Sequence, residues 1–156
     1  MVRLAIPGTQ NRWWNLPAVP VDPLLHAIRT LRHLIRSRAQ APLEMAAALQ
    51  RGEHLGMLVD QHFSRGADVT FFGRRCKANP SIARLARQFD CPVVGVRVIR
   101  LPNHRFRIAA EGPFDLPRDP SGRIDVQQST QMITSVIERW VRENPDQWLW
   151  FHRRWR

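Results

Sequence analysis

Apolar residues recur at helical spacing in four parts of this chain, each bounded by a start or stop signal. Asp22 with Pro23, and Asn79 with Pro80, are typical of helix starts, whereas Gly52 is a typical stop after a helix. The spacing therefore predicts an amphipathic helix in each part. The predicted helices are 22–35, 42–49, 79–89 and 125–144.

Between these helices, shorter apolar runs predict strands. The run 55–59 is too brief for a helix, and 93–99 is dense in β-branched valine and isoleucine. Apolar and polar residues alternate over 105–110 after a turn at 102–104, as expected for a hairpin partner, and 71–75 is a second short strand-like piece. Because helices and strands alternate, we expect an α/β fold with a central mixed sheet flanked by helices.

Residues 1–21 show neither helical nor strand periodicity and contain Pro7, Gly8, Pro17 and Pro20. We expect this segment to be irregular and residues 22–156 to form the domain.

A polar group, Asp60 with Gln61 and His62, follows the predicted core strand 55–59, at the strand end where α/β sheets place ligand chemistry. A solvated turn would show the same pattern.

The chain is strongly basic, with a formal net charge of +11 and an isoelectric point near 11.6. Lys77 is the only lysine, so arginine supplies nearly all of the positive charge. Arginine binds phosphate and carboxylate bidentately, which favours phosphorylated lipid, nucleic acid or an acidic protein as partner. Arg29 and Arg32 form a basic stripe on helix 22–35, where they act either as a phosphate grip or as a solvated face.

Cys76 and Cys91 lack the spacing of a metal site or disulfide framework, which fits a reducing compartment. No apolar run approaches the length of a transmembrane helix, so we expect any contact with a membrane to be peripheral.

The last ten residues, QWLWFHRRWR, mix tryptophan with arginine. Such a mixture either packs on the core or lies at a membrane interface.

Three ordered segments resemble the bacterial lipid A biosynthesis acyltransferases, lauroyl and myristoyl transferases of the lysophospholipid acyltransferase superfamily. The segments are ALQRGEHLGMLVDQHF followed by VTFFG, ARLARQFDCPVVGVRVIRLPNHRFRI, and the tail PDQWLWFHRRWR. The resemblance implies a glycerolphosphate-acyltransferase-like α/β fold at the cytoplasmic face of the inner membrane. It also implies transfer of a fatty acyl chain from acyl carrier protein, or from a coenzyme A thioester, to a hydroxyl of an anionic glycolipid or lysophospholipid, without a further cofactor.

The chain departs from this family at the catalytic base, which is a histidine with an aspartate or glutamate five positions later. No histidine here has that acid. The residues five positions after His26, His33, His54, His62 and His104 are Leu31, Arg38, Val59, Ala67 and Ala109. The family motif would precede Met1, so we expect the chain to be the C-terminal half of a family member, with the N-terminal half missing and with no catalytic residue of its own.

The resemblance assigns roles to six residues of the chain. Asp60 and Gln61 match the family's Asp-Gln after the strand, and we expect them to shape the substrate pocket. Arg153 and Arg154 match paired arginines of the tail, with either a structural role or a contact to glycolipid phosphate. Arg29 and Arg32 match a basic helix less clearly. A further hypothesis pairs His62 with Asp60 as a replacement base and acid, because alternate residues of an extended segment share a side.

Two functions of different classes follow from these observations. One is an acyltransferase whose basic surface contacts acyl carrier protein and anionic lipid at the inner membrane. The other is a catalytically inactive remnant that acts as a basic membrane-surface or nonspecific anion-binding module. Specific nucleic-acid binding is not expected, because the aromatic residues cluster beside arginines in the tail and no recognition motif is present.

Overall fold

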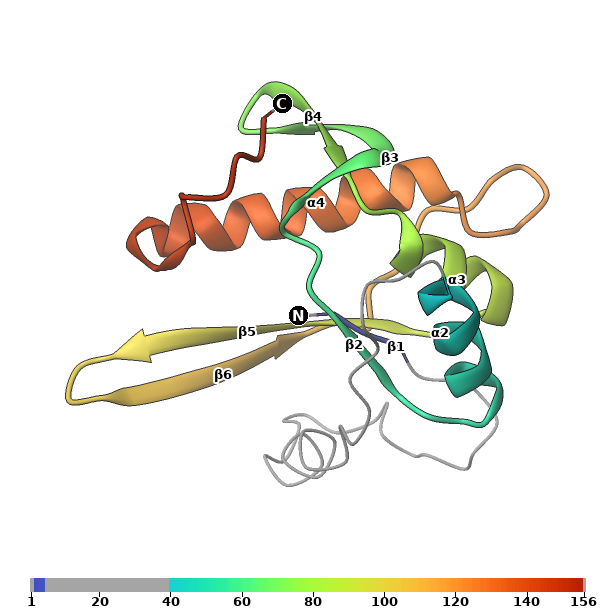
Figure 1. The fold of residues 1–156 in the computed structure, drawn as a ribbon, viewed down its shortest axis with the longest axis horizontal. Coiled ribbons are helices and arrows are strands. Elements are labelled where there is room, and N and C mark those ends of the chain that lie inside the picture. The colour runs from blue at the N-terminus through green and yellow to red at the C-terminus, as the bar shows by residue number, and fades with distance from the viewer. Residues whose placement is uncertain (1, 5–39, 156) are drawn as a thin grey trace.

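A computed structural model describes residues 2–4 and 40–155 of the chain (Figure 1). The predicted helix 22–35, with Arg29 and Arg32, lies outside the described residues. The strands are β1 (Val2–Leu4), β2 (Leu55–Met57), β3 (His62–Phe71), β4 (Arg74–Ala78), β5 (Val93–Leu101) and β6 (Arg105–Glu111). The helices are α2 (Ala41–Gln50), α3 (Ser81–Phe89), α4 (Val126–Glu143) and the short 3-10 helix η2 (Pro145–Gln147).

The described strands form two antiparallel sheets, so the fold is α/β but the expected central mixed sheet is wrong. One sheet has the strand order β2-β1-β5-β6, and the other pairs β3 with β4. Short turns join β3 to β4 and β5 to β6, and such turns permit only antiparallel pairing. Strand β1 lies inside the segment expected to be irregular, pairing Val2 with both Met57 and Gly95. Three residues are too few to show strand alternation in the sequence.

The predicted helices of the described region are confirmed, although α3 begins at Ser81 with Pro80, and not the expected Asn79, in the cap position. Asp125 accepts a hydrogen bond from the Gln128 backbone N–H at 2.9 Å and so caps α4. The Asn79 side chain accepts from the Ser81 N–H at 2.9 Å before α3. Asp90 ends that helix in the left-handed conformation with φ 45°.

The predicted strands 55–59 and 71–75 differ from the structure in their extent. Strand β2 ends at Met57, and Leu58 points into solvent with 71% of its surface exposed, whereas Val59 is buried. The centre of 71–75 is a tight turn, because Phe72 and Gly73 both have positive φ, 51° and 72°. The strand expected there is instead a β3–β4 hairpin that begins at His62.

Helix α4 lies between the β3–β4 hairpin and the four-stranded sheet (Figure 1). Toward the sheet, Trp140 packs so closely on Gly95 that a Cβ there would lie 2.6 Å from its Cη2 atom. Toward the hairpin, the Gln131 side chain bonds both the backbone N–H and the carbonyl of Thr70, at 2.8 and 3.0 Å. The helix thus fixes the hairpin over a core that includes Leu49, Phe71, Ile82, Ala86, Val93, Ile133 and Ile137.

Candidate functional site

The segment with Asp60 and Gln61 connects the two sheets, running from the end of β2 to the start of β3. Asp60 is half-buried, and its Oδ2 atom accepts a hydrogen bond from the indole N–H of Trp148 at 3.3 Å. The Gln61 side chain is exposed. The structure therefore places both residues at a fixed bend, with one of them open to a ligand.

Arg154 holds this bend from the inside. Its side chain is 1% exposed, and its Nη1 atom donates to the backbone carbonyls of Gln61 at 3.0 Å and Lys77 at 2.6 Å. The guanidinium also lies over the Phe71 ring, 5.3 Å from its centroid. These contacts support a structural role for Arg154, whereas its neighbour Arg153 is exposed.

The buried charge of Arg154 has no carboxylate in hydrogen-bond contact among the described residues. Burial lowers the pKa of the Arg154 guanidinium, and the charges of Cys76 and Asp60 oppose that shift. Burial likewise raises the pKa of the Cys76 thiol, against the positive charge of Arg154. Asp60 thus lies in the field of a buried cation that is fixed by backbone carbonyls.

The proposed pair of Asp60 and His62 is not joined by a hydrogen bond in the described structure. The His62 backbone N–H donates to the Nε2 atom of His152 at 2.6 Å, and its own Nδ1 atom is buried without a partner among the described residues. Asp60 bonds Trp148 instead. The hypothesis of a replacement base and acid therefore has no hydrogen-bond geometry behind it.

Aromatic side chains of the tail pack against the tip of the β3–β4 hairpin. Trp148 and Trp155 lie 5.5 and 5.7 Å from Phe71 between ring centroids, and the Trp155 indole N–H donates to the Phe71 carbonyl at 3.0 Å. Of the two alternatives for the tail, packing on the core holds for these residues. Leu149, Trp150 and Phe151 remain exposed, Phe151 at 93%. The contact of Trp148 with Asp60 has no local sequence signal, because it spans 88 residues.

Neither cysteine forms a disulfide, and both are buried. Burial raises the pKa of the Cys91 thiol to about 11. Within residues 2–4 and 40–155, no group of three or more metal-ligating side chains comes together. In the same part of the chain, no helix is long and apolar enough to span a bilayer.

Comparison with protein families gives one match, to a model described as bacterial lipid A biosynthesis acyltransferase, over residues 30–156. The chain belongs to this family. A comparison with individual curated proteins found no match. The family match includes Arg32 and the four described candidate residues of this family member, whereas Arg29 lies just before it.

Proposed function

We propose that this chain takes part in the transfer of a fatty acyl group from acyl carrier protein, or from a coenzyme A thioester, to a hydroxyl of a lipid A precursor or lysophospholipid. The cytoplasmic face of the inner membrane is the proposed location. The family match over residues 30–156 carries the proposal. The net charge of +11 supports it, because carrier protein, coenzyme A and acceptor lipid are all anionic.

Within this function, Asp60 and Gln61 shape the substrate pocket. The indole N–H of Trp148 donates to Oδ2 of Asp60. The Oδ1 atom makes no hydrogen bond to the described residues and is available to a substrate hydroxyl. The exposed amide of Gln61 offers both a donor and an acceptor. Exposed Arg153 is the proposed contact to a lipid phosphate in the tail. Arg29 and Arg32 are proposed to add phosphate contacts.

The reaction requires a base. The acceptor hydroxyl attacks the thioester carbonyl, the C–S bond breaks, and the hydroxyl proton passes to a base. No histidine of the chain has an acid five positions later, and neither His62 nor His152 bonds a carboxylate in the described structure. This observation favours a second candidate, a basic module that binds a membrane surface or other anions without turnover.

Acceptor-dependent consumption of the thioester separates the two candidates. The purified chain is incubated with lauroyl or myristoyl carrier protein, with and without a hydroxyl-bearing acceptor lipid, and both thioester and product are followed by mass spectrometry. An acyltransferase consumes thioester only when the acceptor is present. Thioester loss at the same rate with and without the acceptor, or no loss at all, would instead support the binding module.

Two matched variants test the role of Asp60 in this assay. Asp60→Asn keeps an oxygen for the Trp148 N–H but removes the negative charge, so the fold is retained while turnover falls at least about tenfold. Asp146→Asn removes an exposed carboxylate in η2 and leaves turnover unchanged. Equal rates in the two variants would exclude Asp60 from the pocket.

A further inference from the structure

One face of the β5–β6 hairpin carries apolar side chains that the described structure leaves uncovered. Val98 pairs with Ile108 and Arg100 pairs with Phe106, and paired residues project to the same face of a sheet. Val98 is 61%, Phe106 62% and Ile108 37% exposed. We call Val98, Arg100, Phe106 and Ile108, with His104 at the turn, the hairpin face.

The opposite face of the hairpin contacts α4. Arg97 lies over the Trp140 ring, 5.4 Å from its centroid, and forms an ion pair with Glu143. The side chain of Gln147 also bonds the backbone N–H and carbonyl of Arg100, at 2.7 and 3.1 Å, along the strand edge away from β6. The hairpin is thus held in a fixed orientation, with the hairpin face turned away from its supports.

The hairpin carries positive charge that no acidic residue of the hairpin balances. No acidic residue occurs in the sequence between Asp90 and Glu111. Arg100 lies on the hairpin face, whereas Arg105 and Arg107 pair with Leu101 and Ile99 on the opposite face. None of these three arginines forms an ion pair with the described residues, unlike Arg97 nearer the base of the hairpin. An acidic surface therefore complements the hairpin, and on the hairpin face, where Arg100 supplies the charge, its occupant also has to cover apolar side chains.

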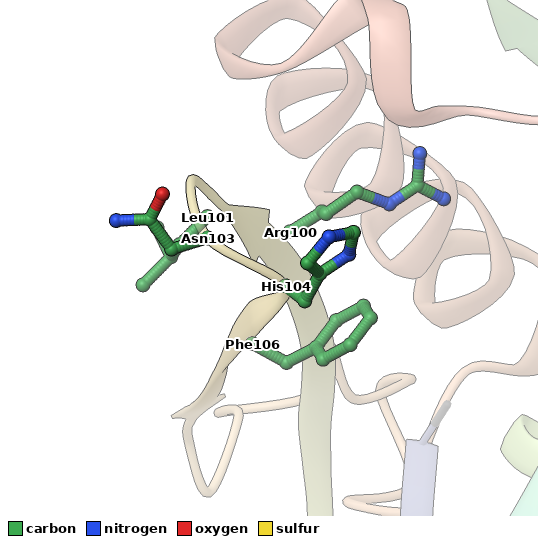
Figure 2. Close-up of a pocket in the computed structure, with 5 residues that line it drawn as sticks. All are labelled: Arg100, Leu101, Asn103, His104 and Phe106. Atoms are coloured by element: carbon green, nitrogen blue, oxygen red, sulfur yellow. The ribbon is translucent and has the colours of Figure 1, made fainter.

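A shallow hollow near the turn includes part of the hairpin face, with Leu101 and Asn103 on the other side of the hairpin (Figure 2). It has a volume of about 700 Å³ and is lined by Arg100, Leu101, Asn103, His104 and Phe106. Figure 2 shows the side chains of Arg100, His104 and Phe106 on one side of the hairpin, with the phenyl ring next to the imidazole. A guanidinium beside an aromatic ring suits a phosphate group joined to an apolar chain.

We propose that the hairpin face docks on a bilayer that contains anionic phospholipid. Val98, Phe106 and Ile108 enter the boundary between headgroups and acyl chains, while Arg100 binds lipid phosphate. Exposed aromatic and aliphatic side chains with an arginine beside them are typical of membrane-interface surfaces. The inference deepens the proposed function, on which it rests for the presence of a lipid acceptor, because it names the element that brings the chain to that acceptor's membrane.

An environment-sensitive fluorophore at the hairpin face tests this docking directly. Cys76 and Cys91 are 4% and 3% exposed, so a nitrobenzoxadiazole label attaches to an introduced cysteine. The full chain with Phe106→Cys is titrated with vesicles of phosphatidylcholine alone, or with one quarter phosphatidylglycerol. We expect a blue shift and brightening only with the anionic vesicles. The matched control is Leu43→Cys, at a site that is 73% exposed on α2, on the opposite side of the molecule (Figure 1).

Variants without a label test which side chains drive the binding. Each arginine at an anionic membrane surface contributes about fivefold in affinity, so Arg100→Gln weakens vesicle binding about fivefold, whereas Arg84→Gln, on the exposed surface of α3, has less effect. Val98→Ser with Phe106→Ser weakens binding at least about tenfold, with an unchanged thermal transition because both side chains are already exposed.

Two results would overturn the proposal. One is that vesicles bind while the label at position 106 stays in water. The other is that the hairpin variants lose binding to acyl carrier protein but keep vesicle binding, which would assign this face to an acidic protein. No acyl donor is present in the vesicle experiments, so an absence of acyl transfer leaves their outcome unaffected.

Discussion

The guanidinium of Arg154 donates to the backbone carbonyl of Gln61 over 3.0 Å, although 93 residues separate them in the chain. A second bond from the same nitrogen reaches Lys77 in β4. Through Arg154, the tail thereby connects the bend after β2 with the β3–β4 hairpin. This contact makes the shape of the candidate site depend on the folding of the tail.

Replacement of Arg154 by alanine is expected to lower the free energy of unfolding by about 3 kcal/mol, because two partly buried carbonyls lose their donor and the buried side chain leaves a cavity. Urea titration measures the change. Arg153→Ala is the matched control, since that side chain is exposed, and we expect a change below about 0.5 kcal/mol. Equal destabilisation by the two variants would show that the bonds to Gln61 and Lys77 contribute little.

Trp148→Phe keeps an aromatic ring against Phe71 but removes the N–H that bonds Asp60. We expect a loss of about 1 kcal/mol of stability, the contribution of one partly exposed hydrogen bond. A double-mutant cycle with Asp60→Ala isolates this bond from the loss of ring area. If the losses of the two single variants add fully in the double variant, the bond does not contribute to stability.

Gly95→Ala tests the close packing of α4 on the sheet. The added Cβ would lie 2.6 Å from Cη2 of Trp140 and 3.0 Å from Cζ of Phe114, so side chains have to move. Overpacking of this kind costs about 1–3 kcal/mol. Trp140→Phe removes the clashing atom, and we expect the double variant to lose less stability than the sum of the single variants. Additive losses, measured by urea titration, would contradict this packing.

The sequence was sufficient for the helices of the described region and for the β5–β6 hairpin, because their signals are local. Asp125 before a periodic apolar face predicted α4, and Asn79 with Pro80 predicted α3. The sheets were predicted less well. Strand β1 has three residues and its partners lie at Leu55–Met57 and Val93–Gly95, so no local pattern reveals its pairing. The turn at Phe72 and Gly73 was not predicted, because residues 71–75 resemble a short strand in the sequence.

The candidate residues were predicted from the sequence, but the side chains that hold them in place were not. Asp60 and Gln61 were identified from their place after a strand and from the family resemblance. Their contacts with Trp148 and Arg154 span 88 and 93 residues, and aromatic and basic composition in the tail does not specify which atoms meet. The burial of Arg154, 1% exposed, favours the structural one of the two roles that the sequence left open.

Asp119 makes stability depend on acid pH. The pKa of this carboxyl is lowered from 3.8 to about 2. The causes are a hydrogen bond from the Ser121 side chain, bonds from the backbone N–H groups of Arg123 and Ser121, and the ion pair with Arg87. Because the folded pKa lies below the unfolded value, the stabilisation is present above pH 4 and is lost as pH falls toward 2. Asp119→Asn should therefore destabilise the chain at pH 6 and have less effect at pH 2. Urea midpoints at both pH values measure this difference, with Asp146→Asn as the exposed control. A destabilisation that is the same at both pH values would contradict the role of the carboxylate charge.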